Sequence, residues 1–276
     1  MNARIGVTLP QFTGDVSVLL DAVRRAEDAG LDSVWVFDHM WPLGHRVRPI
    51  LECWTTLAFL AAHTEDIDIG TLVTRSSIRH PAVLARMAAT VARMAPERLT
   101  IGVGSGDEAS RMENVASGLP FYSGPARSVQ LAETVDALRS HLRGEDHSAP
   151  PVWVGGRSPA ARKVAAAHAD GWNCWGATPE AFADEAREVR AGAGDRPFEV
   201  SWGGLFVVAA DDAAARGKLG SRDPSAYLVG GAEVVAGRLA ALAAAGAGHI
   251  IATFPDAGSR GSYEVLGAVK ESLRRA

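Results

Sequence analysis

The feature that most constrains the fold is a regular alternation of short β-branched runs with longer segments of helical period. Strands are predicted over Arg4–Leu9, Asp32–Phe37, Ile67–Val73, Leu99–Val103, Val152–Gly155, Gly171–Trp175, Val200–Val208 and His249–Phe254. Helices are predicted over Val16–Ala29, Leu51–His63, Ala82–Ala95, Ala126–Arg143, Pro159–His168, Pro179–Ala191, Glu233–Ala245 and Tyr263–Arg275. The segment Ala209–Tyr227 is only partly helical by pattern. Eight such units favour a closed, parallel (β/α)₈ barrel over an open doubly wound sheet.

Chain length and composition limit the class of protein further. A barrel of this kind needs about 250 residues, so the 276 residues predict a single barrel domain over 1–276. The net charge of −4 and the absence of a basic run argue against nucleic-acid binding. No apolar run reaches the roughly 18 residues of a membrane span, and no signal-peptide pattern is present.

Cysteine and histidine spacing bears on metals and on the cellular compartment. Cys53 and Cys174 lie far apart and form no metal-binding pair, and no helical zinc spacing occurs. We therefore expect no metal, and we expect a reduced, cytoplasmic protein.

In a barrel, catalytic residues follow the carboxyl ends of the strands, and Asp38-His39 follows the second predicted strand. Histidine accepts or donates a proton near neutral pH. The alternative is a buried aspartate paired with an arginine, beside a histidine that caps a loop. Trp41 is a candidate wall for a flat ligand.

Glycines follow the fourth strand in Gly102-Val103-Gly104-Ser105-Gly106, where Gly104 and Gly106 allow close approach of a ligand. The run lacks the full spacing of a dinucleotide fingerprint, so that interpretation is weak. Asp107 then places a carboxylate at the barrel mouth, where it either transfers a proton or caps the next segment.

A third group of candidates follows the fifth strand, in Gly155-Gly156-Arg157-Ser158-Pro159. Small residues directly before a helix expose backbone N–H groups to an anion, and Arg157 and Ser158 add donors. Thr178 precedes the next helix in the same way. These residues predict a phosphate site, and the alternative is a tight turn that needs glycine for geometry alone.

Motifs along the whole chain, in this order and spacing, resemble the bacterial-luciferase-like flavin and deazaflavin oxidoreductases. They are Gly6–Gln11, Leu31–His39, Glu52–Leu57, Ile69–Thr74, Arg79–Ala82, Gly102–Gly106, Gly155-Gly156 and Ala169–Asn173.

The resemblance implies a luciferase-like barrel with coenzyme F420, a deazaflavin, or FMN at its C-terminal mouth. The absence of a long insertion favours the F420-dependent branch. In that branch the residue matching His39 lies against the ring, and an acid, here Asp107 where glutamate is commoner, is a proton donor. A cis peptide bond is implied between Leu72 and Val73, behind the ring.

The resulting hypothesis is an enzyme that transfers hydride between F420 and a small organic substrate. His39 and Asp107 are its predicted catalytic residues, and Trp41 is the predicted substrate contact. The cofactor is expected to contact Asp38, Leu72, Val73, Gly104, Gly106, Gly155, Gly156, Arg157, Ser158 and Thr178. The alternatives are an FMN-dependent monooxygenase that uses dioxygen, a non-catalytic binder of flavin or deazaflavin, and an unrelated phosphate-binding barrel enzyme. By the same resemblance we expect a homodimer.

Overall fold

The structure is a computed structural model that describes residues 3–42, 48–143, 148–256 and 259–275. The barrel strands are β1 (Arg4–Thr8), β2 (Ser33–Val36), β3 (Asp68–Arg75), β4 (Leu99–Gly104), β5 (Val152–Gly155), β6 (Gly171–Trp175), β7 (Glu199–Val208) and β9 (His249–Thr253). The surrounding helices are α1 (Val16–Asp28), α2 (Cys53–His63), α3 (Pro81–Met94), α5 (Gly124–Arg143), α6 (Pro159–His168), α7 (Pro179–Ala193), α9 (Ala232–Ala244) and α10 (Arg260–Arg275).

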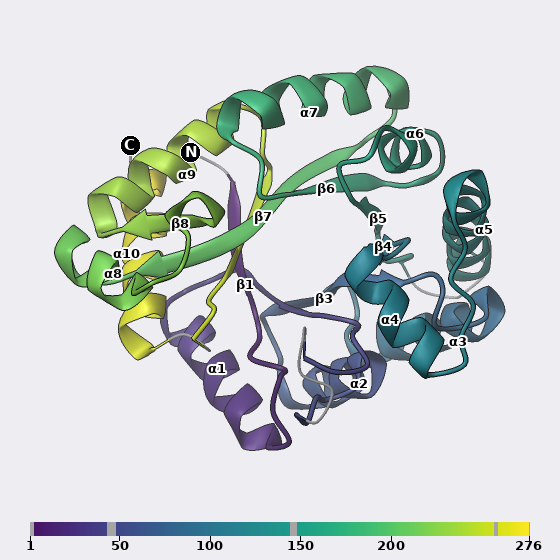
Figure 1. The fold of residues 1–276 in the computed structure, drawn as a ribbon, viewed down its shortest axis with the longest axis horizontal. Coiled ribbons are helices and arrows are strands. Elements are labelled where there is room, and N and C mark those ends of the chain that lie inside the picture. The colour runs from purple at the N-terminus through teal and green to yellow at the C-terminus, as the bar shows by residue number, and fades with distance from the viewer. Residues whose placement is uncertain (1–2, 43–47, 144–147, 257–258, 276) are drawn as a thin grey trace.

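The strands close into a parallel barrel. Within the described residues they pair in the order β1-β2-β3-β4-β5-β6-β7-β9, and β9 pairs back with β1. Figure 1 looks along the barrel and shows the strands around its axis with the helices outside. The predicted (β/α)₈ barrel is therefore confirmed, and each predicted strand corresponds to one strand of the barrel.

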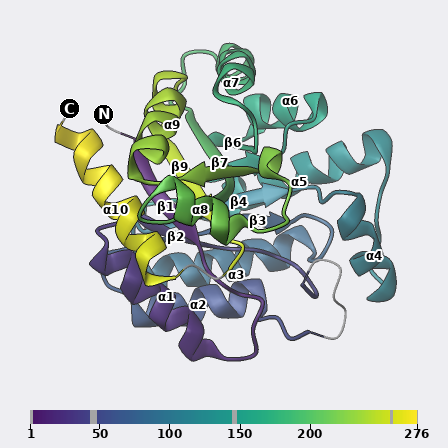
Figure 2. The same ribbon diagram turned by 60° about the vertical axis from the view of Figure 1, so that its left-hand side comes forward.

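Some local elements differ from the prediction. The helix α4 (Glu108–Ala116) lies where no helix was predicted, and Figure 2 shows it at one edge of the molecule. The partly helical segment contains α8 (Asp212–Leu219) and the 3₁₀ turn η1 (Pro224–Ala226), and it is followed by the short strand β8 (Tyr227–Gly230). Among the described residues, this strand pairs with the second half of β7 alone, outside the barrel.

Several helix ends follow directly from local sequence. Ser158 and Thr178 precede prolines at the start of α6 and α7, and their hydroxyls accept hydrogen bonds from the backbone N–H groups of Ala161 and Ala181. Gly30 follows α1 with a φ of 68°, a conformation that glycine adopts without steric cost. The caps at Ser158 and Thr178 fix where two mouth loops end, whereas Gly30 lies in a connection at the opposite end of the barrel.

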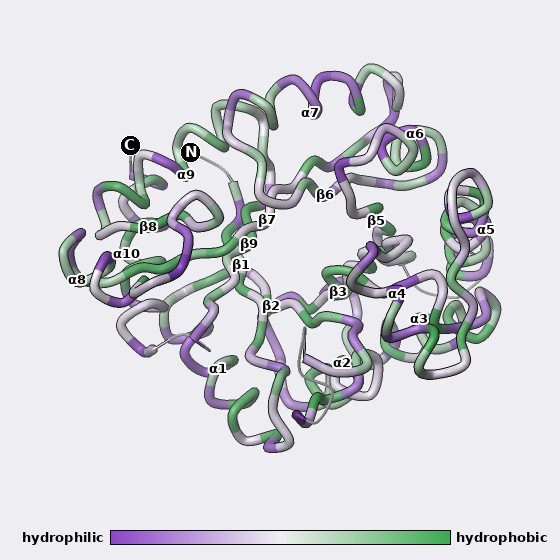
Figure 3. The backbone as a smooth tube through the Cα atoms, viewed as in Figure 1, coloured by the Kyte–Doolittle hydropathy of each residue, from purple (hydrophilic) through white to green (hydrophobic). Residues whose placement is uncertain are grey.

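Most apolar residues pack in one cluster between the barrel wall and the helices. In Figure 3 the apolar colour follows the strands, and polar residues gather on the outer helices. A smaller cluster contains Trp35 of β2 and Trp153 of β5, whose ring centroids lie 5.4 Å apart. Since β2 and β5 are not neighbouring strands, these indoles meet inside the barrel.

A polar chain crosses this interior at the amino-terminal ends of the strands; we call it the floor relay. The indole N–H of Trp35 donates to the hydroxyl oxygen of Ser33 (2.8 Å), which lies 2.7 Å from Nε2 of His249. Burial lowers the pKa of His249 to about 3, so this imidazole is neutral in the folded protein. The floor relay thus consists of neutral groups only.

Candidate active site

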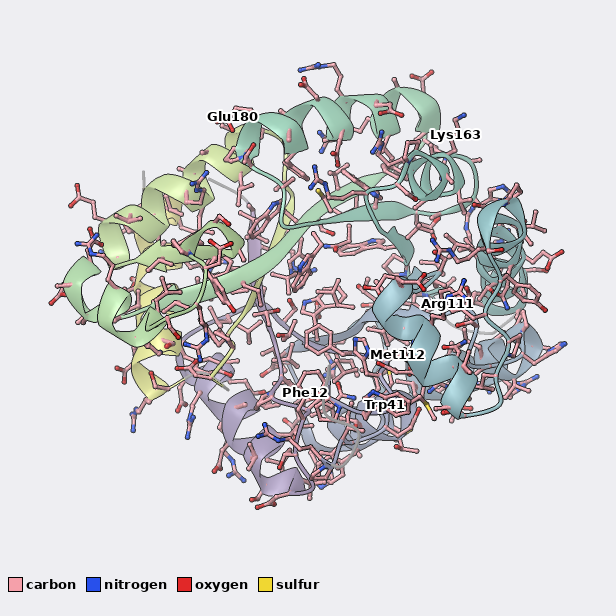
Figure 4. All side chains as sticks on the ribbon, viewed as in Figure 1. Phe12, Trp41, Arg111, Met112, Lys163 and Glu180 are labelled. Atoms are coloured by element: carbon pink, nitrogen blue, oxygen red, sulfur yellow. The ribbon has the colours of Figure 1, made fainter. Side chains whose placement is uncertain are left out.

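The carboxyl ends of β2, β3 and β4 bring a dense set of ionisable side chains to one side of the barrel mouth. Asp38 and His39 follow β2, Arg75 ends β3, and α4 follows β4. Figure 4 shows that Phe12, Trp41 and Met112, the last on α4, lie on this same side of the mouth. This is the part of the barrel in which parallel α/β barrels carry their chemistry.

His39 is held by a carboxylate from α4. Its Nδ1 lies 2.8 Å from Oε1 of Glu113, and the other oxygen of Glu113 accepts the backbone N–H of Met40 at 2.8 Å. The Glu113 side chain is 1% exposed, whereas that of His39 is 18% exposed. The Nδ1 edge of the imidazole is therefore fixed inside the protein, while part of the ring remains accessible.

Arg75 connects the strand ends to α4. Its Nη2 donates to Glu113 (2.8 Å), its Nη1 to the side-chain oxygen of Asn114 (3.1 Å), and its Nε to the backbone carbonyl of Asp38 (2.8 Å). Only 3% of the Arg75 side chain is exposed. Burial alone would raise the pKa of Glu113, but hydrogen bonds from His39 and Met40 and the charge of Arg75 outweigh it and lower this pKa.

Asp38 accepts hydrogen bonds through both carboxylate oxygens. One oxygen accepts from the Thr74 hydroxyl (2.9 Å), the Arg75 backbone (2.9 Å) and Arg79 (2.6 Å), and the other accepts from Arg79 (3.1 Å). The Trp54 indole N–H donates to the same Thr74 hydroxyl at 2.9 Å. We call the chain Trp54–Thr74–Asp38 the mouth relay. The buried aspartate paired with arginine, weighed above as the alternative for Asp38, is thus what the geometry shows.

Asp107 caps α4. Its Oδ1 accepts hydrogen bonds from the backbone N–H (2.9 Å) and the hydroxyl (2.8 Å) of Ser110. Burial alone would raise the pKa of Asp107, but the bonds from Ser110 and the charge of His39 outweigh it and lower the pKa. The geometry favours capping over proton donation, because both bonds from Ser110 hold this carboxylate at the start of α4.

Val73, which is half-buried near the end of β3, packs closely against three glycines of β4 and β5. A Cβ on Gly104 would lie 2.4 Å from a methyl of Val73, and one on Gly155 would lie 2.7 Å from the other methyl. Gly102 is similarly close to Val73. These glycines therefore make room for Val73. The Leu72–Val73 peptide bond is cis, as the resemblance predicts.

The predicted anion donors are only partly accessible. Arg157 binds Glu185 through Nε and Nη2, the latter at 2.7 Å, and this bond is the main reason that its pKa is raised. Ser158 and Thr178 cap their helices, and Thr178 also binds the carboxylate of Glu180. No described residue accepts a hydrogen bond from the backbone N–H groups of Arg157 and Ser158. Gly156, with a φ of 125°, precedes them. These two N–H groups at the start of α6 fit an anionic group.

Three further features of the described residues bear on ligands and membranes. Trp41 is partly buried, and residues 43–47, in the loop after it, lie outside the described residues. Within the described ranges, no group of three or more His, Cys, Asp or Glu side chains has an arrangement that holds a metal ion. In the same ranges, every helix is too short or too polar to cross a membrane.

A family model described as luciferase-like monooxygenase matches residues 3–263. The chain belongs to this family.

Among curated luciferase-like relatives, the F420-dependent glucose-6-phosphate dehydrogenase of Beutenbergia cavernae is 32% identical over 169 residues. The match covers 54% of this chain and 49% of that protein. The F420-dependent hydroxymycolic acid dehydrogenase of Mycobacterium tuberculosis is 29% identical over 192 residues, 61% of this chain and 51% of that protein. The matches thus span about half the length of these relatives.

Solved luciferase-like structures share the whole fold. An F420-dependent secondary alcohol dehydrogenase, in complex with an F420–acetone adduct, superposes with a TM-score of 0.82 at 21% identity, covering 99% of this chain and 100% of that one. The EDTA monooxygenase of Chelativorans sp. BNC1 gives a TM-score of 0.81 at 12% identity, covering 100% and 94%. At these identities the likeness shows the fold alone.

Sequence reasoning missed the residues that hold His39, namely Glu113 and Arg75. Arg75 lies at a strand exit, but nothing local shows what it binds. Glu113 lies on α4, in a segment for which no helix was predicted. The spacing Asp107-x-x-Ser110, in which both side chains bond to the other's backbone, is the one local signal that a helix begins there.

Proposed function

We propose that this luciferase-like chain is an F420-dependent oxidoreductase that transfers hydride between F420 and a small organic substrate at the barrel mouth. The observation that carries the proposal is His39, a partly accessible imidazole held at the mouth by a buried carboxylate and a buried arginine. The names of the curated relatives, which are F420-dependent dehydrogenases, support the choice of cofactor.

The chain's own residues have distinct parts in this proposal. Val73, in the space left by Gly104 and Gly155, would form the surface behind the cofactor ring. The free N–H groups of Arg157 and Ser158 would bind an anionic group of the cofactor. F420, when bound, supplies or takes up the hydride. The proton that accompanies the hydride is exchanged at His39, and Asp107 keeps α4 in place.

The main alternative is an FMN-dependent monooxygenase, because a monooxygenase superposes on this fold almost as well as an F420-dependent enzyme does. A non-catalytic binder is the third candidate. The expected homodimer and cytoplasmic location stay predictions.

Titration of the purified protein with F420 and with FMN, followed by fluorescence, separates these functions. We expect tight F420 binding, weak FMN binding, and F420-linked turnover within a panel that includes propan-2-ol and glucose 6-phosphate. His39→Ala is expected to lower kcat by about 10²–10⁴-fold, the usual worth of a proton-transfer group. The matched control is His63→Ala, which changes an exposed histidine on α2. Tight FMN binding without F420 binding would overturn the proposal, and F420 binding without any turnover would favour the binder.

A further inference from the structure

We propose that Glu113 is a positioning residue that holds His39 with its proton on Nδ1, so that Nε2 is the nitrogen that exchanges a proton with the substrate. Arg75 keeps Glu113 in place. The inference rests on the proposed function, but it concerns a residue that neither the motifs nor the comparisons assign.

The hydrogen bond between His39 and the ionised carboxylate of Glu113 fixes the tautomer of His39. An ionised carboxylate is only an acceptor, so a ring nitrogen 2.8 Å from Oε1 of Glu113 must carry the hydrogen. The pKa of Glu113 is lowered, so its carboxylate is ionised near neutral pH. Neutral His39 therefore has Nδ1–H and a free lone pair on Nε2. Protonated His39 keeps the same bond and carries its second proton on Nε2.

Arg75 and Met40 hold the carboxylate in one orientation. Glu113 uses Oε1 for His39 and Oε2 for the Arg75 guanidinium and the Met40 N–H, each at 2.8 Å. Since Arg75 is also bonded to Asn114 on α4 and to the backbone after β2, it fixes α4 against two strand ends. With three donors bound, the Glu113 side chain has little freedom to rotate away from His39.

The same contacts argue against a relay of protons onward from His39. The guanidinium of Arg75 favours the ionised form of Glu113. A proton taken from an alcohol O–H at Nε2 therefore stays on His39, where Glu113 balances its charge, while the hydride leaves the alcohol carbon for F420. In the reverse direction the Nε2 proton goes to the oxygen of the carbonyl compound. Glu113 acts through His39 and not on the substrate.

The chain offers a matched control on the same helix. Glu108 is five residues before Glu113, its side chain is 79% exposed, and it pairs with Arg111 at 2.7 Å. Glu108→Gln removes the same charge from α4 without touching His39, whereas Glu113→Gln allows the amide to donate to Nδ1 and so permits the other tautomer.

The first measurement needs no substrate. Two-bond ¹H–¹⁵N spectra of ¹⁵N-histidine-labelled wild-type protein, with His39→Ala for assignment, report which ring nitrogen carries the proton. We expect the Nδ1–H tautomer in the wild type and in Glu108→Gln, and a mixture in Glu113→Gln. A predominant Nε2–H tautomer in the wild type would overturn the inference. This result stands even if the protein fails to bind F420 or if Glu113→Gln fails to fold.

The second measurement uses the alcohol turned over in the panel above. We expect Glu113→Gln to lower kcat by about 10²–10⁴-fold, as when an amide replaces the carboxylate that sets a catalytic histidine's tautomer. The KM for the alcohol and the Kd for F420 should stay within threefold. Glu113→Asp, which restores the carboxylate, should recover part of kcat. If Glu113→Gln kept the wild-type kcat, the inference would be contradicted and F420 dependence would stand. If the wild-type protein failed to bind F420, the proposed function alone would be contradicted.

Discussion

The floor relay and the mouth relay have the same three-part construction with different ends. In each, an indole N–H donates to a side-chain hydroxyl, Trp35 to Ser33 in the floor and Trp54 to Thr74 at the mouth. The hydroxyl then meets the neutral imidazole of His249 in one case and the carboxylate of Asp38 in the other. The floor thus ends in a neutral group, and the mouth continues into a charged network.

The consequence of this difference is seen in His249, which belongs to the floor relay, and His39, which lies at the mouth. His249 is buried, has a hydroxyl as its partner, and stays neutral because burial disfavours its charged form. His39 is partly accessible and is bonded to a carboxylate that is itself paired with arginine. The same residue type is thus structural at one end of the barrel and suited to proton exchange at the other.

The largest change in the free energy of unfolding is expected from His249, and it tests whether this histidine is neutral in the folded protein. The unfolded chain protonates this residue near its ordinary value of 6.5, whereas the folded protein resists protonation down to about pH 3. The unfolded state then binds the extra proton, so stability falls as pH drops from 6.5 towards 3, by about 5 kcal/mol from this residue. Urea unfolding across this range, compared with His249→Gln, should show a steeper loss in the wild type. Equal slopes would mean that the floor histidine is not held neutral.

The next effect tests the charged network of the mouth. Arg75→Met leaves Glu113 buried without its guanidinium partner, and breaking a buried pair in this way costs about 3–5 kcal/mol. Urea unfolding measures it. The control Arg24→Met, which breaks the exposed pair of Arg24 with Asp21 on α1, should cost less than about 1 kcal/mol. Equal losses in both variants would remove the contrast between a buried mouth network and an ordinary surface pair.

The smallest losses of stability are expected when the hydroxyl of each relay, on Thr74 or on Ser33, is removed. Thr74→Val removes a hydrogen bond to the arginine-paired carboxylate of Asp38 and should cost about 1.5–3 kcal/mol, whereas Ser33→Ala removes one to a neutral imidazole and should cost about 0.5–1.5 kcal/mol. Unfolding free energies at pH 7 decide the order. A larger loss for Ser33→Ala would reverse the comparison of the two relays.

The architecture was predictable because its signals are local. The strand at Arg4–Thr8 is indicated by its side-chain pattern, and the helix at Pro159–His168 is indicated by its capping residues; both signals lie within a few positions. The strand β8 was not predicted because it is only four residues long and, among the described residues, pairs with β7 outside the barrel. The helix α4 was not predicted because it is short and the side chains that it buries, Ser110, Glu113 and Asn114, are polar.

The candidate site was predictable in part only. The positions of Asp38, His39 and Asp107 at strand exits follow from the alternation of elements, and the alternatives of pairing for Asp38 and capping for Asp107 were visible in principle. Their partners were not, because Asp38 and Arg79 lie 41 residues apart and His39 and Glu113 lie 74 residues apart. Likewise Arg157, which precedes α6, was expected to face an anion, but its partner Glu185 lies on α7.

The barrel, its strand exits and the family can be inferred from the amino-acid sequence, because hydrophobic period, glycine placement and helix caps act over a few residues. Which ionisable groups meet depends on the folded arrangement. Closing the barrel brings β2, β3 and α4 together, and the resulting burial and pairing separate a neutral His249 from a carboxylate-bound His39. Those properties depend on distances and dielectric surroundings that exist only in the folded chain.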